Sequence, residues 1–360
     1  MCIEIILFIL FILIFIFFIK ILCDKKEKFI NDEKIDLVYT WVSSECEKYN
    51  NIRKQYVESK VEYFESIDLF ESVSSLLNYT FSKTNDSCNR LSNMNEIEYS
   101  IKSVKKNIPW INNIYIVLPK LHFEYFPVKD DNIILVAQED LLKNSLGDFN
   151  PSFNSNAIEL CFDEIPGLSN IFLYMNDDVI INKSLKIEDF YKDDKILVIY
   201  QKFLGLHISP YLASNFMNFV TLNNETSSIA RYKSSLLIDN EKKMLVSHAP
   251  IIIDKKIYTK IKNKFNKEVL VTLGNKFRSS NDLVFPHYIY PHYMEKIDKT
   301  FNSKLRIEEV KWTDSELLNY NIVKRIKREK DNFSFLLIND ERSVCDKDSK
   351  LFIKMLNSII

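Results

Sequence analysis

Glycine is scarce in this chain, which has 360 residues and only 4 glycines. A phosphate-binding loop or a dinucleotide fingerprint needs several closely spaced glycines, because their backbone must approach the phosphate. The scarcity therefore excludes both motifs. Any phosphate that the protein binds must be held by side chains and by the amino-terminal ends of helices.

A concentrated basic surface is also missing. The 48 lysines and arginines are balanced by 49 aspartates and glutamates, the formal net charge is -1, and no basic block stands out. Proteins that bind nucleic acid usually gather positive charge on one face. We therefore expect no nucleic-acid partner.

Closely paired cysteines are missing as well. None of the 6 cysteines forms a C-x-x-C pair, and Cys2 and Cys23 flank an apolar segment at the start of the chain. This spacing argues against a zinc site. One or two disulfides among the other four cysteines are compatible with a body that lies in an oxidising compartment.

The apolar segment runs unbroken from Ile5 to Ile19. Its length lies between that of a signal-peptide core and that of a membrane-spanning helix. No small-residue cleavage site follows, so we expect residues 1–23 to form a signal anchor rather than a signal peptide, with residues 24–34 as a stem. Three lysines follow the segment and only Glu4 precedes it, so the positive-inside tendency alone would place the body in the cytoplasm.

Strand-like and helix-like segments alternate along the rest of the chain. We expect buried strands at 35–42, 114–118, 133–136, 171–175, 248–253 and 333–338, and helices at 96–107, 156–165, 255–265 and 350–360. The alternation predicts an α/β, Rossmann-like fold with a largely parallel sheet and helices on both faces. The N-terminal hydrophobic membrane segment precedes this fold.

A single catalytic domain is expected over residues 35–360. Residues 43–95, which include one expected helix near 61–77, do not follow the alternation, and neither do residues 190–245. Both segments are predicted to be insertions.

The clearest chemical signal is Asn176-Asp177-Asp178, directly after the strand expected at 171–175. Ligands of open α/β sheets bind beyond the carboxyl ends of the strands. Adjacent carboxylates at such a place can hold a divalent cation on the phosphates of a nucleotide sugar. An Asx turn that closes the strand explains the same triplet.

Three other residues have both a functional and a structural interpretation. Glu159 can face the same crevice, or it can form a capping pair with Asn156 at the start of its helix. His248, before Ala249-Pro250, suits proton transfer near neutral pH, although a lone histidine is more often structural. Arg278 is either a phosphate clamp or a solvated surface cation.

Four blocks of sequence occur in a fixed order along the body. They are IDLVYTWV at 35–42; a long block between 95 and 179 that includes PWINNIYIV, FNSNAIE and YMNDDV; a block from HAP at 248–250 to FRSSND at 277–282; and LIND at 337–340. In content and order these blocks resemble the regions of the Stealth family. That family includes bacterial capsule sugar-phosphate transferases and the animal GlcNAc-1-phosphotransferase that acts on lysosomal enzymes.

The resemblance implies an activity and a set of essential residues. We expect transfer of a sugar 1-phosphate, such as N-acetylglucosamine 1-phosphate, from a UDP-sugar to a hydroxyl of an acceptor glycan, with release of UMP. The family's essential carboxylates fall on Glu159 and Asp178. Its essential histidine and arginine fall on His248 and Arg278.

The resemblance also implies ligands and surroundings. Asp178, with Asp177, would hold Mg²⁺ or Mn²⁺, and substrate-binding roles are expected for Asp36, Trp41, Asn154, Asp282 and Asn339. The expected partners are a UDP-sugar donor, a glycan or glycoprotein acceptor, the membrane through the N-terminal segment, and a second copy of the chain in a homodimer. Against the charge tendency, the family implies a type II protein of the secretory pathway, in the Golgi membrane with a luminal catalytic domain.

Two other functions are open at this point. A metal-dependent glycosyltransferase would use Asn176-Asp177-Asp178 as its metal motif and release UDP instead of UMP. An inactive, membrane-anchored glycan-binding relative is suggested by the turns at 43–45 and 118–120, which depart from the family pattern.

Overall fold

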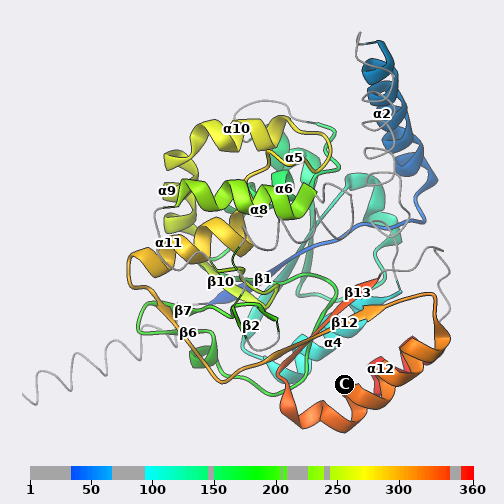
Figure 1. Ribbon diagram of the computed structural model, residues 1–360, viewed down its shortest axis with the longest axis vertical. Coiled ribbons are helices and arrows are strands. Elements are labelled where there is room, and N and C mark those ends of the chain that lie inside the picture. Colours follow the sequence, from blue (N-terminus) through cyan, green and yellow to red (C-terminus); the bar gives the residue numbers. More distant parts are fainter. Residues whose placement is uncertain are drawn as a thin grey trace, which may run out of the picture.

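A sheet of five strands forms the centre of the molecule. Figure 1 presents the computed structural model, which describes residues 34–66, 94–144, 150–203, 206–207, 209, 226–238, 244–340 and 350–360. The strand order is β10-β4-β1-β2-β3. The strands are β1 (Ile35–Thr40), β2 (Ile111–Leu118), β3 (Ile133–Ala137), β4 (Ile171–Tyr174) and β10 (Ile251–Asp254).

Four of these strands are parallel, which confirms the predicted parallel sheet. β1 pairs in parallel with β2 and β4, and β2 pairs in parallel with β3. β10 runs antiparallel along the outer edge of β4. β1 and β4 are buried along nearly their whole length, as expected for strands that are covered on both faces. The carboxyl ends of β1, β2 and β4 therefore meet at one edge of the sheet.

A second, smaller sheet continues from the carboxyl end of β4. Its strands, in the order β12-β13-β5, are β5 (Val179–Ile181), β12 (Ile307–Trp312) and β13 (Phe335–Asp340). A short turn over residues 175–178 joins β4 to β5, and the Ile338 N–H donates a hydrogen bond to the Asp178 carbonyl at 3.1 Å. The carboxyl end of β13 consequently lies beside this turn.

Helices lie on both sides of the central sheet, with α8 to α11 on one side and α4 on the other (Figure 1). The helices are α2 (Glu47–Ser66), α4 (Glu96–Asn107), α5 (Gln138–Asn144), α6 (Ser155–Glu159), α8 (Thr226–Leu237), α9 (Lys255–Lys264), α10 (Asn266–Gly274), α11 (Tyr290–Lys296), α12 (Glu316–Glu329) and α13 (Lys350–Ile359). α4 buries Ile97, Ile101 and Val104, which is the face that its spacing predicts.

Short elements connect these helices and strands. They are η2 (Lys120–Tyr125), η3 (Phe162–Glu164), η4 (Ile187–Asp189), η6 (Lys330–Asn332), the π-helical turn η5 (Phe285–Ile289), and the strands β6 (Tyr191–Lys192), β7 (Lys195–Leu197), β8 (Lys202–Phe203), β9 (Leu206–His207) and β11 (Thr300–Phe301).

The helix expected at 156–165 is shorter and begins earlier than predicted. α6 ends at Glu159, and η3 follows it as a separate turn. Asn154, rather than Asn156, is the N-cap, because its side chain accepts a hydrogen bond from the Asn156 N–H at 3.1 Å. The predicted capping pair of Asn156 and Glu159 is therefore wrong. Glu159 instead lies at the end of α6, with its side chain in the protein interior.

The expected anchor, residues 1–23, lies outside the described residues, as does the stem except for Lys34. Within the described parts of the chain, no helix has the length and apolar character needed to cross a bilayer. The segment 43–95 contains α2, which begins at Glu47 and so starts well before the helix expected near 61–77. Residues 67–77 of that expected helix lie outside the described residues.

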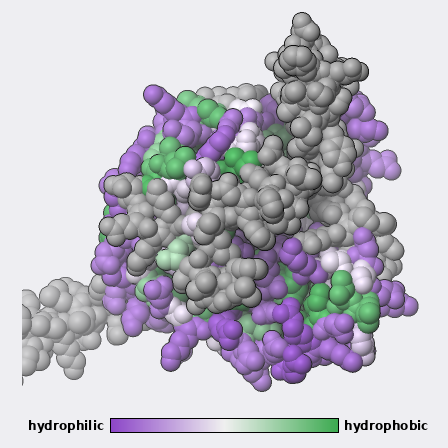
Figure 2. Space-filling model, viewed as in Figure 1, coloured by the Kyte–Doolittle hydropathy of each residue, from purple (hydrophilic) through white to green (hydrophobic). Residues whose placement is uncertain are grey.

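The surface visible in Figure 2 is mostly hydrophilic, and its apolar side chains gather in small patches. Leu317, Leu318 and Tyr320 of α12 are among the exposed large hydrophobic residues. Small groups of this kind are normal on a soluble domain surface.

Trp312→Ala is expected to lower the free energy of unfolding by about 3–5 kcal/mol, because the Trp312 side chain, at the end of β12, is fully buried and meets Phe352 of α13 edge to face at 5.0 Å. Urea denaturation followed by circular dichroism measures the change. Leu317→Ala is the control, since Leu317 is 70% exposed, and it is expected to change the stability by less than about 0.5 kcal/mol. Equal losses in both variants would contradict the assigned packing.

Candidate active site

A cavity of about 780 Å³ opens at the edge where the parallel strands end. Its floor is formed by residues at or just after the carboxyl ends of β1, β2, β4 and β13, and its walls by α2, α6, α8 and the segments before β10 and after α10. Seven of the ten residues that the sequence predicts for the site line this cavity: Trp41, Glu159, Asp177, Asp178, His248, Arg278 and Asn339. Location at the carboxyl edge agrees with the rule for open α/β sheets.

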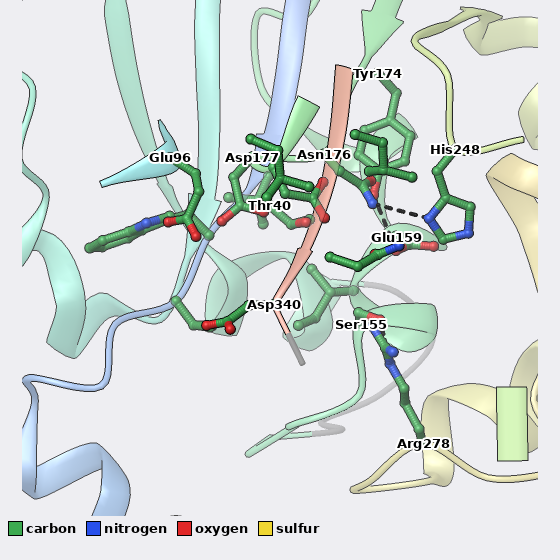
Figure 3. A pocket seen from close by; sticks show the side chains of 18 of the residues that line it. Thr40, Glu96, Ser155, Glu159, Tyr174, Asn176, Asp177, His248, Arg278 and Asp340 are labelled. Atoms are coloured by element: carbon green, nitrogen blue, oxygen red, sulfur yellow. Dashed lines mark hydrogen bonds between the residues drawn. The ribbon is translucent and has the colours of Figure 1, made fainter. Parts of the chain in front are cut away.

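The labelled side chains divide the cavity into two sides. In Figure 3, Glu96, Asp177 and Asp340 lie on one side, and Glu159, His248 and Arg278 lie on the other. One side of the cavity thus carries three carboxyl groups, and the other side carries one carboxyl group, a histidine and the guanidinium of Arg278. A substrate that carries both a cation and exposed phosphoryl oxygens would match this division.

The acidic side is built around the turn after β4. Burial raises the pKa of Asp177 above its ordinary value. Burial also raises the pKa of Asp178 well above its ordinary value, and the neighbouring carboxylates of Asp177 and Glu96 raise it further. Glu96, at the start of α4, has a pKa of about 8 for the same main reason, its burial. Such crowding of buried carboxyl groups is costly and is typical of functional sites.

Glu159 is placed by the end of α6 and by a tyrosine of β4. The Tyr174 hydroxyl donates a hydrogen bond to Glu159 Oε1 at 3.1 Å, and the Tyr258 hydroxyl donates to the Glu159 backbone carbonyl at 2.7 Å. Burial raises the pKa of Glu159 to about 7, although Arg278 and the Tyr174 hydrogen bond act in the opposite direction. The carboxyl group can therefore exchange a proton near neutral pH.

His248 is brought to the turn after β4 by strand pairing. β10 runs antiparallel to β4 with Ile251 opposite Tyr174, so the residues just before β10 lie next to the residues just after β4. Nδ1 of His248 is 3.5 Å from Nδ2 of Asn176 (Figure 3). Burial lowers the pKa of His248 well below its ordinary value, and His287, Arg231 and Arg278 lower it further. The imidazole is therefore neutral and able to accept a proton.

Arg278 lies at the mouth of the cavity. Its Nε and Nη2 both donate to Ser155 Oγ, at 2.9 and 2.6 Å. Ser155 is the first residue of α6, so this contact fixes the guanidinium beside the helix that carries Glu159. The side chain is exposed, which leaves it accessible to a ligand in the cavity.

Asn154 and Asp282 do not line the cavity but hold its wall together from behind. Asp282 is buried and accepts hydrogen bonds from Asn154 Nδ2, Asn156 Nδ2, Asn275 Nδ2 and the Ser279 N–H, at 2.8 to 3.0 Å. These bonds join the start of α6 to the loop that carries Arg278. The structure therefore gives both residues a role in positioning, and the substrate-binding role predicted for them has no support in their location.

Asp36 is also placed away from the cavity. It is the second residue of β1 and so lies near the amino-terminal edge of the sheet, whereas the cavity lies at the carboxyl edge. Its carboxylate accepts hydrogen bonds from Asn112 Nδ2, the Asn113 N–H and the Ser169 N–H, at 2.8 to 3.0 Å. The substrate-binding role predicted for Asp36 therefore has no support in its location, and its hydrogen bonds instead join β1 to its neighbours.

Several cavity residues were not predicted as site residues. They include Arg53 from α2, Glu96 from α4, Tyr174 from β4, Arg231 from α8 and Lys311 from β12. Glu96 lies inside the long block between 95 and 179 that resembles a Stealth region, so its position in the sequence could have identified it as a candidate site residue. Arg53 and Arg231 come from the segments 43–95 and 190–245, which were interpreted as insertions, and only the folded chain brings them to the cavity.

The residues around Asp178 suit a divalent cation, although they form only part of a coordination shell. Asp178 Oδ1 is buried and makes no hydrogen bond with the described residues. Among the described residues, no group of three or more His, Cys, Asp or Glu side chains is arranged to hold a metal ion. Mg²⁺ commonly takes one or two carboxylates and completes its shell with water and substrate phosphates, so Asp177 and Asp178 fit this role.

The raised pKa of Glu159 predicts a specific dependence of stability on pH. The carboxyl group holds its proton more tightly in the folded state, with a pKa of about 7, than in the unfolded state, with a pKa of 4.5. Its contribution to stability is therefore lost as the pH rises through this range. The free energy of unfolding of Glu159→Gln, relative to that of the wild type, should therefore increase by about 2.5 kcal/mol between pH 5 and pH 8.

Urea denaturation at the two pH values measures this change. The control is Glu188→Gln, because Glu188 is exposed on the surface, and its stability relative to the wild type should change much less between the two pH values. A relative stability of Glu159→Gln that does not change with pH would disprove the assigned burial of the carboxyl group.

Comparison with known families identifies two matching regions. A family model described as Stealth protein CR2, conserved region 2, matches residues 90–199, and one described as Stealth protein CR3, conserved region 3, matches residues 247–295. The first region contains Glu159 and Asp178, and the second contains His248 and Arg278. The resemblance of 35–42 and 337–340 to further Stealth regions stays a prediction.

Several curated relatives are capsular polysaccharide phosphotransferases. That of Haemophilus influenzae, fcs1, is 29% identical over 261 residues, which cover 72% of this chain and 65% of the relative. That of Actinobacillus suis is 27% identical over 351 residues, covering 91% and 83%. SacB of Neisseria meningitidis serogroup A is 27% identical over 317 residues, which cover 87% of this chain but only 51% of the relative.

Two solved structures share a weaker similarity. The galactosyltransferase LgtC, in complex with donor and acceptor sugar analogues, has a TM-score of 0.37 at 13% identity, covering 74% of this chain and 92% of LgtC. Mouse xyloside xylosyltransferase 1 has a TM-score of 0.38 at 7% identity, covering 84% and 97%. Both scores are too low to establish a common fold.

The two family models and the relatives aligned along up to 91% of the chain show that this protein carries conserved regions 2 and 3 of the Stealth family.

Proposed function

We propose that this protein transfers a sugar 1-phosphate, such as N-acetylglucosamine 1-phosphate, from a UDP-sugar to a hydroxyl of an acceptor glycan and releases UMP. The observation that carries the proposal is the cavity itself. It gathers Glu159 and Asp178 from one conserved Stealth region with His248 and Arg278 from the other. The capsular phosphotransferases among the relatives are named for the same class of reaction.

The reaction needs a base and a site for charge on the transferred group. The acceptor hydroxyl oxygen attacks the phosphorus that carries the sugar, and the proton of this hydroxyl passes to His248. The bond from that phosphorus to the bridging oxygen breaks, so UMP leaves with the bridging oxygen. Arg278 stabilises the charge on the transferred phosphoryl oxygens, and Glu159 is the second group able to exchange a proton.

Asn176 controls which nitrogen of His248 accepts the proton. For Nε2 to be the base, Nδ1 must carry the ring hydrogen and donate it to an acceptor. Asn176 supplies such an acceptor if Oδ1 of its amide faces Nδ1. The oxygen and nitrogen ends of an asparagine amide have nearly the same shape, so either end can occupy this position. The structure presents Nδ2 of Asn176 to Nδ1 of His248 at 3.5 Å. This role therefore requires the amide to be turned so that Oδ1, which has no hydrogen-bond partner among the described residues, faces the ring.

Asp178 and Asp177 would hold Mg²⁺ or Mn²⁺ on the diphosphate of the donor. Oxygen ligands of this kind suit both ions. When bound, the cation neutralises phosphate charge and relieves the repulsion between the two carboxylates. Trp41 and Asn339, which line the same cavity, would help to shape the donor pocket.

The anchor of the enzyme is proposed from residues 1–23, and its orientation and compartment are proposed from the family resemblance. An uncleaved signal anchor there would give a type II protein of the secretory pathway, with the catalytic domain in the Golgi lumen. The acceptor would then be a glycan or glycoprotein of that compartment. A homodimer is the proposed oligomeric form.

A product assay tests the proposal. The soluble body, from about residue 30 onward, is incubated with UDP-N-acetylglucosamine, Mg²⁺ or Mn²⁺, and a mannose-type acceptor, and the nucleotides are separated. UMP that forms only in the presence of the acceptor is the expected result. Formation of UDP would replace the proposal with an ordinary glycosyltransferase. No nucleotide product across a panel of donors would favour an inactive glycan-binding relative.

His248→Gln and Asp178→Asn are each expected to lower the transfer rate by about 10²–10⁴-fold, because one loses the base and the other a charge that holds the diphosphate. Initial rates of UMP release measure the loss, and circular dichroism shows whether each variant is folded. Lys260→Gln on the exposed face of α9 is the control and should keep the wild-type rate. A folded His248→Gln variant with near-normal turnover would disprove the assigned base.

A further inference from the structure

A second histidine lies directly against His248. The imidazole rings of His248 and His287 stack with their centroids 4.9 Å apart and their planes only 11° from parallel. His287 is 7% exposed, and it does not line the cavity. The side chain therefore supports the wall of the site from the protein interior, behind His248.

His287 also contacts the strand that positions Glu159. Its ring centroid lies 5.2 Å from that of Tyr174, with the two planes tilted by 40°. Tyr174 in turn donates its hydroxyl hydrogen bond to Glu159. His287 thus contacts both the aromatic ring that holds Glu159 and the imidazole of His248.

The backbone that presents His287 has an unusual geometry. η5 is a π-helical turn, in which the Ile289 N–H donates to the carbonyl of Val284, five residues earlier, at 3.0 Å. The Val284 N–H is anchored in turn by Ser234 Oγ of α8 at 3.0 Å. A π-turn adds a residue to the helix and redirects the side chains around it, and such turns occur frequently at functional sites. Here the turn directs a flat ring toward His248.

The ring nitrogens of His287 have no role in these contacts. Neither Nδ1 nor Nε2 has a hydrogen-bond partner among the described residues, and burial lowers the pKa of the imidazole to about 3. The ring is therefore neutral. What His287 offers its neighbours is a flat aromatic surface, since stacked rings at this separation attract one another in a defined orientation.

We propose that His287 is a positioning residue that fixes the plane of the His248 imidazole by stacking on it, and that the flatness of the ring rather than its nitrogens performs this role. The inference rests on the proposed function of His248 as the base. Proton transfer requires the accepting nitrogen to lie within hydrogen-bond reach of the acceptor hydroxyl. A ring that can rotate out of plane would meet this requirement only part of the time.

Two substitutions separate flatness from polarity. His287→Phe keeps a flat ring and removes the nitrogens, whereas His287→Leu keeps an apolar side chain and removes the plane. We expect His287→Leu to lower kcat by about 10-fold or more with KM changed less than about twofold, because misplacing a catalytic group affects the reaction rather than substrate binding. His287→Phe should retain kcat within about threefold of the wild type.

A measurement that does not need turnover tests the stack itself. The chain has 5 histidines, so histidine-selective ¹³C labelling gives few ring signals, and His248→Gln identifies the signal of His248. A stacked aromatic ring shifts the proton signals of its neighbour. The His248 signals should be shifted in the wild type and in His287→Phe, and should move toward ordinary values in His287→Leu.

The outcomes distinguish the two proposals. Loss of the shift in His287→Leu supports the stack even if no transferase activity is found, in which case only the proposed function fails. An unchanged His248 signal in folded His287→Leu would overturn the inference. A folded His287→Phe that loses as much kcat as His287→Leu would also overturn it, because the nitrogens would then be the active feature. Thermal melting establishes that each variant is folded, and the comparison of wild type with His287→Leu stands without the Phe variant.

Discussion

The pairing of β4 with strands on both of its sides is the constraint on which the site depends. Parallel pairing with β1 places the turn after β4 at the same edge as Trp41, which follows β1. Antiparallel pairing with β10 brings the residues before β10 to the same turn. One short strand of four residues therefore joins Asp177 and Asp178 to His248, although His248 lies some 70 positions later in the chain. A shift of register by one residue would reverse the faces of β4 and separate these groups.

A buried carboxylate stabilises the cavity wall that is formed by α6 and the loop that carries Arg278. Asp282 accepts four hydrogen bonds, which fasten the start of α6 to the loop that carries Arg278. Hydrogen bonds to a charged, buried acceptor are stronger than those between neutral groups. The side chain thus contributes to the site without touching the cavity, because it sets the distance between Glu159 on α6 and the guanidinium at the mouth.

The cavity concentrates groups that oppose folding. Glu96, Glu159, Asp177 and Asp178 are all carboxyl groups whose pKa is raised by burial, so each is harder to ionise here than in water. The core offsets this cost, since the central sheet and the helices around it form one large apolar cluster. Enzymes usually combine unfavourable interactions at the active site with a core that stabilises the rest of the fold.

The sequence by itself determined the local elements and the chemical identity of most of the site. Spacing alone predicted α4 from Glu96 to Asn107 with the bounds that are observed, because apolar residues at i, i+4 and i+7 mark one face of a helix. Motif order identified Glu159, Asp178, His248 and Arg278, all of which line the cavity. The same reasoning misassigned Asp36, whose motif position says nothing about which edge of the sheet its carboxylate faces. It also missed the N-cap at Asn154, since two asparagines two residues apart are equivalent as sequence signals.

Only the tertiary structure decided which distant side chains share the cavity. Arg53 and Arg231 come from segments that do not follow the alternation of strands and helices, and they reach the cavity through packing between elements far apart in the chain. The stack of His287 on His248 depends on a π-turn and on the pairing of β10. Periodicity and motifs reflect interactions between residues that are close in the chain. These contacts instead join elements that are far apart in the chain, and they depend on strand pairing and core packing, which the whole fold determines.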